Sequence, residues 1–132
     1  MIKNSNRQIK ILIADDEVEF ASTLVTRLKL RNFHTTMANS GEATLAAVEK
    51  DTPDLLLLDL KMPDLDGLEV LAKLRVDHPS LKVIILTGHG SFDAGREGME
   101  LGACDYIMKP IDLSRLIEKI NEACQTDSPG TL

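Results

Sequence analysis

Five polar side chains stand where short apolar stretches of this sequence end, and their types suit the handling of a charged ligand. They are Asp15, Asp16, Asp59, Thr87 and Lys109. Asp59 is the clearest case, because it directly follows four consecutive leucines. A short apolar run between chain breakers is typical of a strand buried on both faces of a parallel sheet. The carboxyl ends of parallel strands meet at one edge, where ligands bind, so we expect these side chains to share one pocket.

The chemistry of this set follows from its charges. Three carboxylates so close together would repel one another, and Lys109 supplies only one positive charge. The other donors are oxygens, with no His or Cys among them, which favours Mg²⁺ over zinc as the additional positive charge. In such a site a carboxylate can attack phosphorus and form an aspartyl phosphate. The plainer interpretation is an acidic surface loop beside a lysine, but the position of every member at a strand end favours the pocket.

These side chains must be positioned by five units in which a strand precedes a helix. The expected strands comprise residues 9–14, 33–38, 55–59, 81–86 and 105–109. After the first strand, apolar residues recur at intervals of three and four from Val18 to Leu28, as in an amphipathic helix. This alternation predicts an α/β fold with three layers, a five-stranded parallel sheet between two layers of helices, five helices in total. The first, third and fourth strands are the most apolar, so we expect them at the centre.

The fourth expected helix, residues 91–101, contains two interior glycines, Gly95 and Gly98, and we expect Ser91 to cap its start. Each interior glycine costs about 1 kcal/mol relative to alanine. The pair indicates either a soft helix or close packing against a neighbouring element, and the sequence leaves both interpretations open.

Length and composition fit one globular domain without a membrane or nucleic-acid partner. The chain has 132 residues, 43% of them hydrophobic and 27% charged, and its net charge of −6 is unsuited to binding nucleic acid. We find no signal sequence and no apolar run of membrane-spanning length. The two cysteines have no metal-binding spacing and fit a reducing cytoplasm. We expect a flexible tail at residues 1–8, the domain at 9–125, and a tail or linker at 126–132.

The sequence resembles the receiver domains of two-component response regulators over about residues 10–125. The resemblance rests on four motifs in a fixed order: Asp15-Asp16, Asp59-Leu60-Lys61-Met62-Pro63-Asp64-Leu65-Asp66-Gly67, Thr87-Gly88, and Tyr106-Ile107-Met108-Lys109-Pro110. It implies a flavodoxin-like fold with strand order 2-1-3-4-5. Whether the Lys109–Pro110 peptide bond is cis is left open by the sequence.

The resemblance implies that Asp59 is the phosphoacceptor and receives a phosphoryl group from a sensor histidine kinase or a phosphotransfer protein. It implies a Mg²⁺ site whose ligands are Asp15, Asp16, Asp59 and the backbone carbonyl of Lys61. Within that set Asp16 would be the direct ligand, and Asp15 would act through water.

The same resemblance implies a switch beside the phosphoacceptor. Lys109 and Thr87 would each bind a phosphoryl oxygen, and Tyr106 would turn inward behind Thr87. The face formed by the fourth helix, fifth strand and fifth helix would then control a partner or output domain. The resemblance is also compatible with a homodimer that forms on phosphorylation. We therefore expect a cytoplasmic phosphoprotein of signal transduction or a phosphorelay, not an enzyme beyond its own phosphorylation and autodephosphorylation.

Two other classes of protein use related folds. A dehalogenase-like phosphatase acting on small phosphate esters also uses Mg²⁺ and an aspartate at a strand end, but it requires an Asp-x-Asp-x-Thr motif. Here Leu60 and Lys61 follow Asp59, so the second aspartate is absent. A flavodoxin-like cofactor binder would need a phosphate loop after the first strand, where residues 15–17 are all acidic and would repel phosphate. Direct binding of ATP is not expected either, because no GxxxxGK[ST] loop is present.

Overall fold

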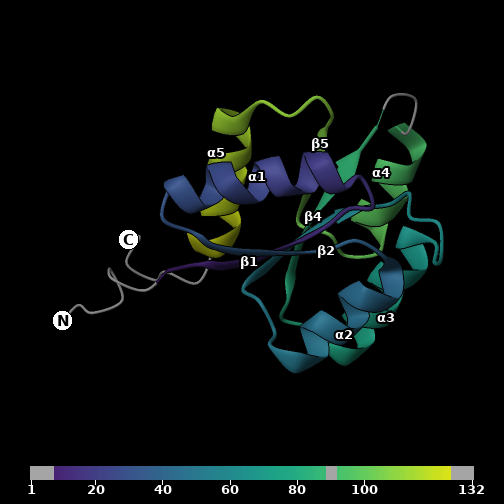
Figure 1. The fold of residues 1–132 in the computed structure, drawn as a ribbon. Coiled ribbons are helices and arrows are strands. Elements are labelled where there is room, and N and C mark those ends of the chain that lie inside the picture. The colour runs from purple at the N-terminus through teal and green to yellow at the C-terminus, as the bar shows by residue number, and fades with distance from the viewer. Residues whose placement is uncertain (1–7, 89–91, 126–132) are drawn as a thin grey trace.

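The computed structural model describes residues 8–88 and 92–125, and in that part strands and helices alternate along the whole chain (Figure 1). The elements in order are β1 (Lys10–Ala14), α1 (Val18–Leu30), β2 (His34–Ala38), α2 (Gly41–Lys50), β3 (Leu55–Asp59), α3 (Gly67–Asp77), β4 (Lys82–Thr87), α4 (Phe92–Glu100), β5 (Asp105–Met108) and α5 (Leu113–Gln125). Of the expected tails, residues 1–8 and 126–132, only residue 8 is described; the rest of both tails and the expected cap at Ser91 lie outside the described residues. The predicted alternation is confirmed.

The five strands form one parallel sheet in the order β2-β1-β3-β4-β5, as predicted. Helices α1 and α5 cover one face, and α2, α3 and α4 cover the other (Figure 1). Strand β2 lies at one edge and exposes three of its five residues, whereas every residue of β3 is buried. The most apolar strands are therefore the central ones.

The leucine run of β3 is continuous because the strand contributes to two hydrophobic cores. Leu55 and Leu57 pack in the core shared with α1 and α5, whereas Leu56 and Leu58 pack in the core shared with α2 and α3. All four side chains are completely buried. Because successive side chains of a strand point to opposite faces, only a strand covered on both sides requires apolar residues at every position.

Short polar side chains begin three of the helices. Ser40 Oγ accepts a hydrogen bond from the backbone amide of Ala43 at 3.0 Å at the start of α2. Asp66 and Asp112 accept backbone amides in the same way at the starts of α3 and α5. Each such cap satisfies an amide that the helix itself leaves unpaired. Helix α1 is different, because its cap position is occupied by Glu17 and no side chain caps it.

The two glycines of α4 have different surroundings. A Cβ atom at Gly98 would lie 1.9 Å from Cδ1 of Ile85, so the end of that buried side chain fills the space that a larger residue would need. A Cβ atom at Gly95 would lie 3.4 Å from both Thr87 Cγ2 and Tyr106 Cδ2, an ordinary contact. Close packing therefore explains Gly98, whereas Gly95 leaves room beside Thr87 and Tyr106.

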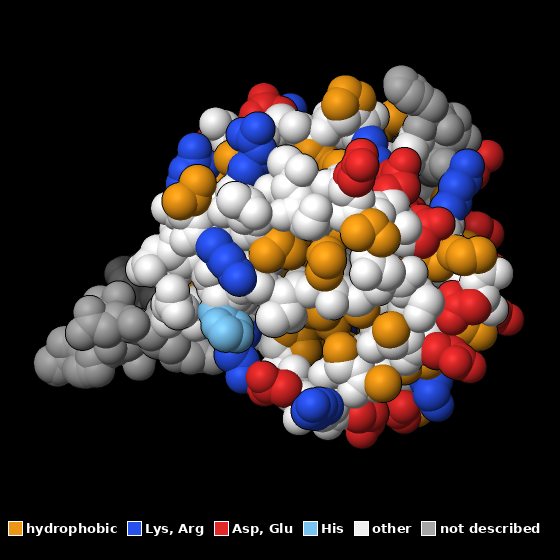
Figure 2. All heavy atoms as spheres, in the orientation of Figure 1, with side chains coloured by type: hydrophobic (Ala, Val, Ile, Leu, Met, Phe, Trp, Pro, Cys, Tyr) orange, Lys and Arg blue, Asp and Glu red, His pale blue; other side chains and the backbone are white. Residues whose placement is uncertain are grey.

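Acidic side chains gather on the side of the molecule that carries α3 and α4 (Figure 2). Within the described part of the chain, no helix has the length and hydropathy needed to cross a membrane.

We predict opposite effects of alanine at the two glycines of α4. Gly98→Ala should lower the free energy of unfolding, because forcing the completely buried Ile85 aside costs about 1–3 kcal/mol, more than the helix-propensity gain of about 1 kcal/mol. Gly95→Ala should keep most of that gain. Urea unfolding followed by circular dichroism measures both changes. A Gly98→Ala protein as stable as Gly95→Ala would contradict the close packing.

Candidate functional site

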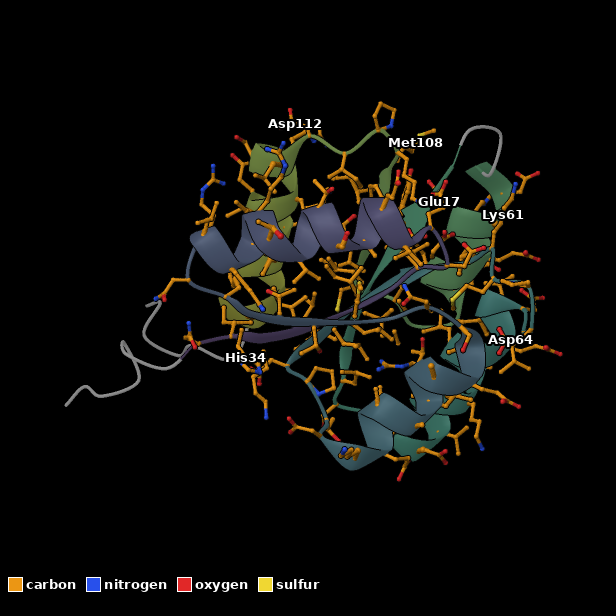
Figure 3. The ribbon with its side chains drawn as sticks, in the orientation of Figure 1. Glu17, His34, Lys61, Asp64, Met108 and Asp112 are labelled. Carbon is orange, nitrogen blue, oxygen red and sulfur yellow. The ribbon has the colours of Figure 1, made fainter. Side chains whose placement is uncertain are left out.

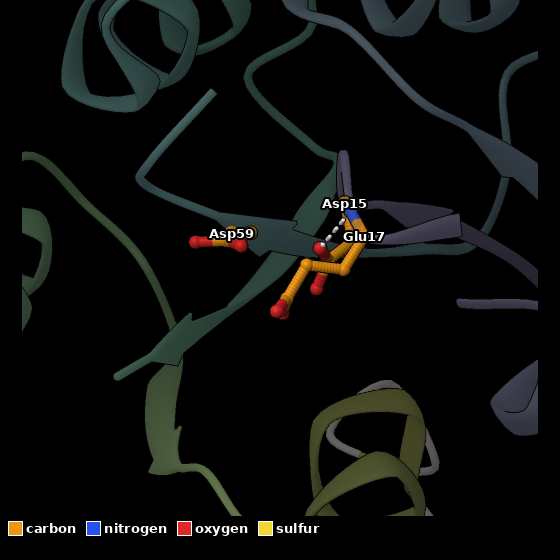
Figure 4. Close-up of side chains that lie close together, drawn as sticks. All are labelled: Asp15, Glu17 and Asp59. Carbon is orange, nitrogen blue, oxygen red and sulfur yellow. Dashed lines mark hydrogen bonds between the residues drawn. The ribbon is translucent and has the colours of Figure 1, made fainter. Parts of the chain in front are cut away.

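The carboxyl ends of β1, β3 and β5 bring an ammonium group into contact with three carboxylates. Lys109 Nζ lies 2.7 Å from Glu17 Oε1, 2.8 Å from Asp15 Oδ2 and 3.2 Å from Asp59 Oδ2. One oxygen of each acid lies within 4.8 Å of the others (Figure 4). The ring of Phe20 covers the same ammonium group, with its centroid 4.4 Å away. Three of the five side chains predicted to converge thus do so.

The two buried carboxylates are held by the loops that follow them. Asp15 is completely buried, and Asp59 is 6% exposed. The backbone amide of Glu17 donates to Asp15 Oδ1 at 2.9 Å, and the backbone amide of Lys61 donates to Asp59 Oδ1 at 2.9 Å. Each acid therefore keeps one oxygen on its own loop and directs the other toward Lys109.

Burial and charge act against each other in this cluster. Burial raises the pKa of Asp15, and the neighbouring charge of Asp59 raises it further, although Lys109 and the amide of Glu17 oppose this rise. Burial alone would lower the pKa of Lys109, but its contacts with the three acids raise it well above its ordinary value. The pKa of Glu17 is lowered by its bond to Lys109. Lys109 is thus firmly charged, and the site carries more carboxylates than cations.

These donors fit a small divalent cation. All are oxygens, and Asp15 Oδ2 is a buried atom with no aligned hydrogen bond, since its contact with Lys109 is an ion pair only. Mg²⁺ prefers oxygen ligands, and a carboxylate oxygen whose hydrogen bonds are not all made is available to bind it. In the described residues, the three clustered acids are Asp15, Glu17 and Asp59, whereas Asp16 is exposed and outside that cluster. Asp16 as a direct ligand stays a prediction.

Thr87 and Tyr106 lie on the neighbouring strands and reach α4. Thr87 ends β4 almost completely buried, and its carbonyl accepts the backbone amide of Lys109 at 2.7 Å. Tyr106, opposite Ile85 in the β4–β5 register, is partly buried and packs against the core beneath α3 and α4. Gly95 of α4 faces both side chains. The Lys109–Pro110 peptide bond that follows is cis.

The loop after Asp59 is fixed by contacts to α2 and to itself. The carboxylate of Asp64 accepts the backbone amides of Gly41 and Glu42 at 2.8 and 2.9 Å, which lowers its pKa (Figure 3). A Cβ atom at Gly67 would lie 2.4 Å from the Cα atom of Leu60, so only glycine fits where the loop closes. The loop that carries the Lys61 carbonyl is therefore held at both ends.

Sequence reasoning missed the roles of Glu17 and Asp64 in this geometry. Glu17 was recognisable as a third acid at the end of the first strand, yet nothing local indicated that it reaches Lys109, 92 residues away. The partners of Asp64 are 22 and 23 residues distant in the sequence. Both contacts depend on how the strands and helices pack, not on local pattern.

Comparison with known proteins identifies close relatives of this chain. Residues 11–121 match the family described as response regulator receiver domain. Sporulation initiation phosphotransferase F of Bacillus subtilis is 35% identical over 113 residues, covering 86% of this chain and 91% of that protein. Transcriptional regulatory protein ZraR of Klebsiella oxytoca is 34% identical over 119 residues, 90% of this chain but only 27% of that protein. The crystal structure of the NtrX receiver domain from Brucella abortus is 33% identical, with a TM-score of 0.84 over 88% of this chain and 98% of that one.

We predict that Asp15→Asn stabilises the protein near neutral pH in the presence of EDTA. Because burial raises the pKa of Asp15, the folded state favours the protonated acid, and its contribution to stability is lost as the pH rises. Asparagine does not titrate, so its advantage should be small at about pH 4 and grow toward neutrality. Urea unfolding across this range measures it, with the exposed Asp16→Asn as control. A wild type more stable than Asp15→Asn at neutral pH would refute this.

Proposed function

This chain belongs to the family of response regulator receiver domains, and on that premise we propose that it accepts one phosphoryl group on Asp59. The donor would be a sensor histidine kinase or a phosphotransfer protein of a two-component system. One observation carries the proposal: Asp59 ends the central strand with Oδ1 held by an amide and Oδ2 directed at Lys109, 3.2 Å away. A carboxylate held in this way is oriented for attack before any substrate arrives.

The transfer itself needs few groups. One oxygen of the Asp59 carboxylate attacks phosphorus while the bond from phosphorus to the donor imidazole nitrogen breaks. That nitrogen keeps the electron pair and takes a proton from solvent. Lys109, whose raised pKa keeps it charged, would neutralise an oxygen of the transferred group. Hydrogen bonds of this charge-assisted kind contribute about 1.5–3 kcal/mol each.

We propose that Mg²⁺ is held by Asp15, Asp16, Asp59 and the backbone carbonyl of Lys61. When bound it would supply the positive charge that one lysine cannot provide against several carboxylates and the phosphoryl oxygens. The buried Asp15 oxygen without an aligned hydrogen bond supports this assignment. The anchoring of Asp64 on α2 would keep the Lys61 carbonyl in place, because both residues lie in the same short loop.

We propose that Thr87 and Tyr106 report the phosphoryl group to the α4-β5-α5 face. Shifting a two-state element from mostly one state to mostly the other takes about 5.5 kcal/mol of differential binding. Two or three charge-assisted bonds from Thr87 and Lys109 approach that figure. Gly95 faces both Thr87 and Tyr106, and the contact of all three supports a coupled movement of Thr87 and the tyrosine ring.

The output of this switch is a separate matter, because this chain spans about a quarter of the length of relatives such as ZraR. We propose that the α4-β5-α5 face acts on a partner or an output domain, and that phosphorylation can bring two copies together. We propose no contact of the domain itself with nucleic acid or membrane, given its net charge of −6.

We predict that the protein gains a single phosphoryl group in acetyl phosphate with Mg²⁺, measured as its intact mass. The adduct should be absent in Asp59→Asn, which lacks the nucleophile, and absent in EDTA, which removes the divalent charge. Asp54→Asn, a change of the same type at the other end of β3, serves as control and should be phosphorylated normally. An adduct of equal yield in Asp59→Asn would contradict the assignment of Asp59 as the phosphoacceptor.

We predict that tyrosine fluorescence follows the switch, because Tyr106 is the one tyrosine of the sequence and there is no tryptophan. Phosphorylation of the wild type should change the emission as the ring enters a different environment. Thr87→Ala should still be phosphorylated but should lose most of the change in emission, because the Thr87 side chain whose movement the tyrosine ring follows is absent. A change in emission of the same size in Thr87→Ala would show that Tyr106 moves independently of Thr87.

A further inference from the structure

Glu17 belongs to none of the roles assigned above, yet it makes the shortest ion pair of the site. Its Oε1 atom lies 2.7 Å from Lys109 Nζ. We propose that Glu17 is a built-in competitor of the phosphoryl group, occupying the donor of Lys109 that a phosphoryl oxygen must take. This inference rests on the proposed phosphorylation of Asp59 and names a regulator of that same site.

The ammonium group of Lys109 has a limited number of donors. A lysine ammonium group has three N–H donors and no more. Three carboxylates already lie within 3.2 Å of Lys109 Nζ, namely those of Asp15, Glu17 and Asp59. Glu17 and Asp59 accept hydrogen bonds from this ammonium group, and Asp15 forms a close ion pair with it, so a phosphoryl oxygen must compete with these carboxylates for Lys109.

The three carboxylates around Lys109 differ in how firmly they are held. Asp15 is completely buried and tied through its other oxygen to a backbone amide, so it cannot move without unfolding the turn before α1. Asp59 carries the phosphoryl group itself. The side chain of Glu17 is 64% exposed and makes no capping bond to α1. Exposed ion pairs are worth little, so Glu17 is the partner that exchanges.

Glu17 also repels negative charge that is added to Asp59. The acid oxygens of Glu17 and Asp59 both lie within the 4.8 Å cluster, so negative charge added at Asp59 would face the carboxylate of Glu17 directly. Like charges at this distance destabilise each other. Competition for the ammonium and repulsion act in the same direction, and both favour the unphosphorylated state. Removing the charge of Glu17 should therefore favour phosphorylation.

The chain offers a matched control on the same helix. Glu19 is exposed two residues further on, so Glu19→Gln removes the same charge from the same region. It has no contact with Lys109 among those the structure gives to that ammonium group. Glu17→Asp keeps the charge on a side chain shorter by one methylene and separates loss of charge from loss of reach.

The test measures the phosphorylation rate constant in acetyl phosphate at saturating Mg²⁺, and the affinity for beryllium fluoride, a non-reacting mimic of an aspartyl phosphate. Glu17→Gln should raise both by about two- to fivefold, the range that an exposed ion pair contributes. Glu19→Gln should match the wild type, and Glu17→Asp should lie between wild type and Glu17→Gln. Affinity for Mg²⁺ alone should not fall in Glu17→Gln.

Three outcomes would overturn the inference while leaving the proposed function intact. A slower Glu17→Gln would mean that Glu17 holds Lys109 in place for the reaction. Weaker Mg²⁺ binding in that variant would make Glu17 a metal ligand. Equal gains in Glu17→Gln and Glu19→Gln would reduce the effect to net charge. A wild type that gains no phosphoryl group on Asp59 would instead refute the proposed function.

Discussion

The repulsion between acids at the carboxyl edge of the sheet is the constraint on which the site depends. Asp15 and Asp59 are buried side by side on neighbouring strands, and Glu17 approaches them from the surface. One ammonium group, Lys109, holds all three. Such a cluster is stable only while Lys109 stays charged and in place. It can still bind further positive charge. A divalent cation is the kind of ligand that this excess of negative charge suits.

The rest of the fold can be understood as the support for that cluster. Strand β3 is buried on both faces, so Asp59 stands at the end of a strand that is packed in both hydrophobic cores. The loop after it is fastened to α2 by Asp64 and closed at Gly67, where no larger residue fits. The side-chain amide of Asn39 also donates to the backbone carbonyl of Asp15 at 2.8 Å, which joins the loop after β2 to the loop after β1. Preorganisation of this kind keeps like charges together despite their repulsion.

The same packing connects the site to one side of the molecule. Helix α4 packs onto Ile85 of β4 at Gly98, whereas a Cβ atom at Gly95 would make only ordinary contacts with Thr87 and Tyr106. In the proposed switch, a movement of either of these two side chains would therefore act on α4 and β5 near Gly95.

The sequence by itself determined the alternation of elements, the central strands, and the acids and lysine at the strand ends. This was possible because the hydrophobic pattern of each strand reflects how deeply that strand is buried. Asp15, Asp59 and Lys109 were predictable as neighbours, since parallel topology brings every carboxyl end to one edge. Only the tertiary structure decided that Glu17 reaches Lys109, that Asp64 caps α2, and that Gly98 serves close packing. These contacts join residues far apart in the chain. The distances between those residues depend on how the helices pack against the sheet, and no local sequence pattern determines that packing.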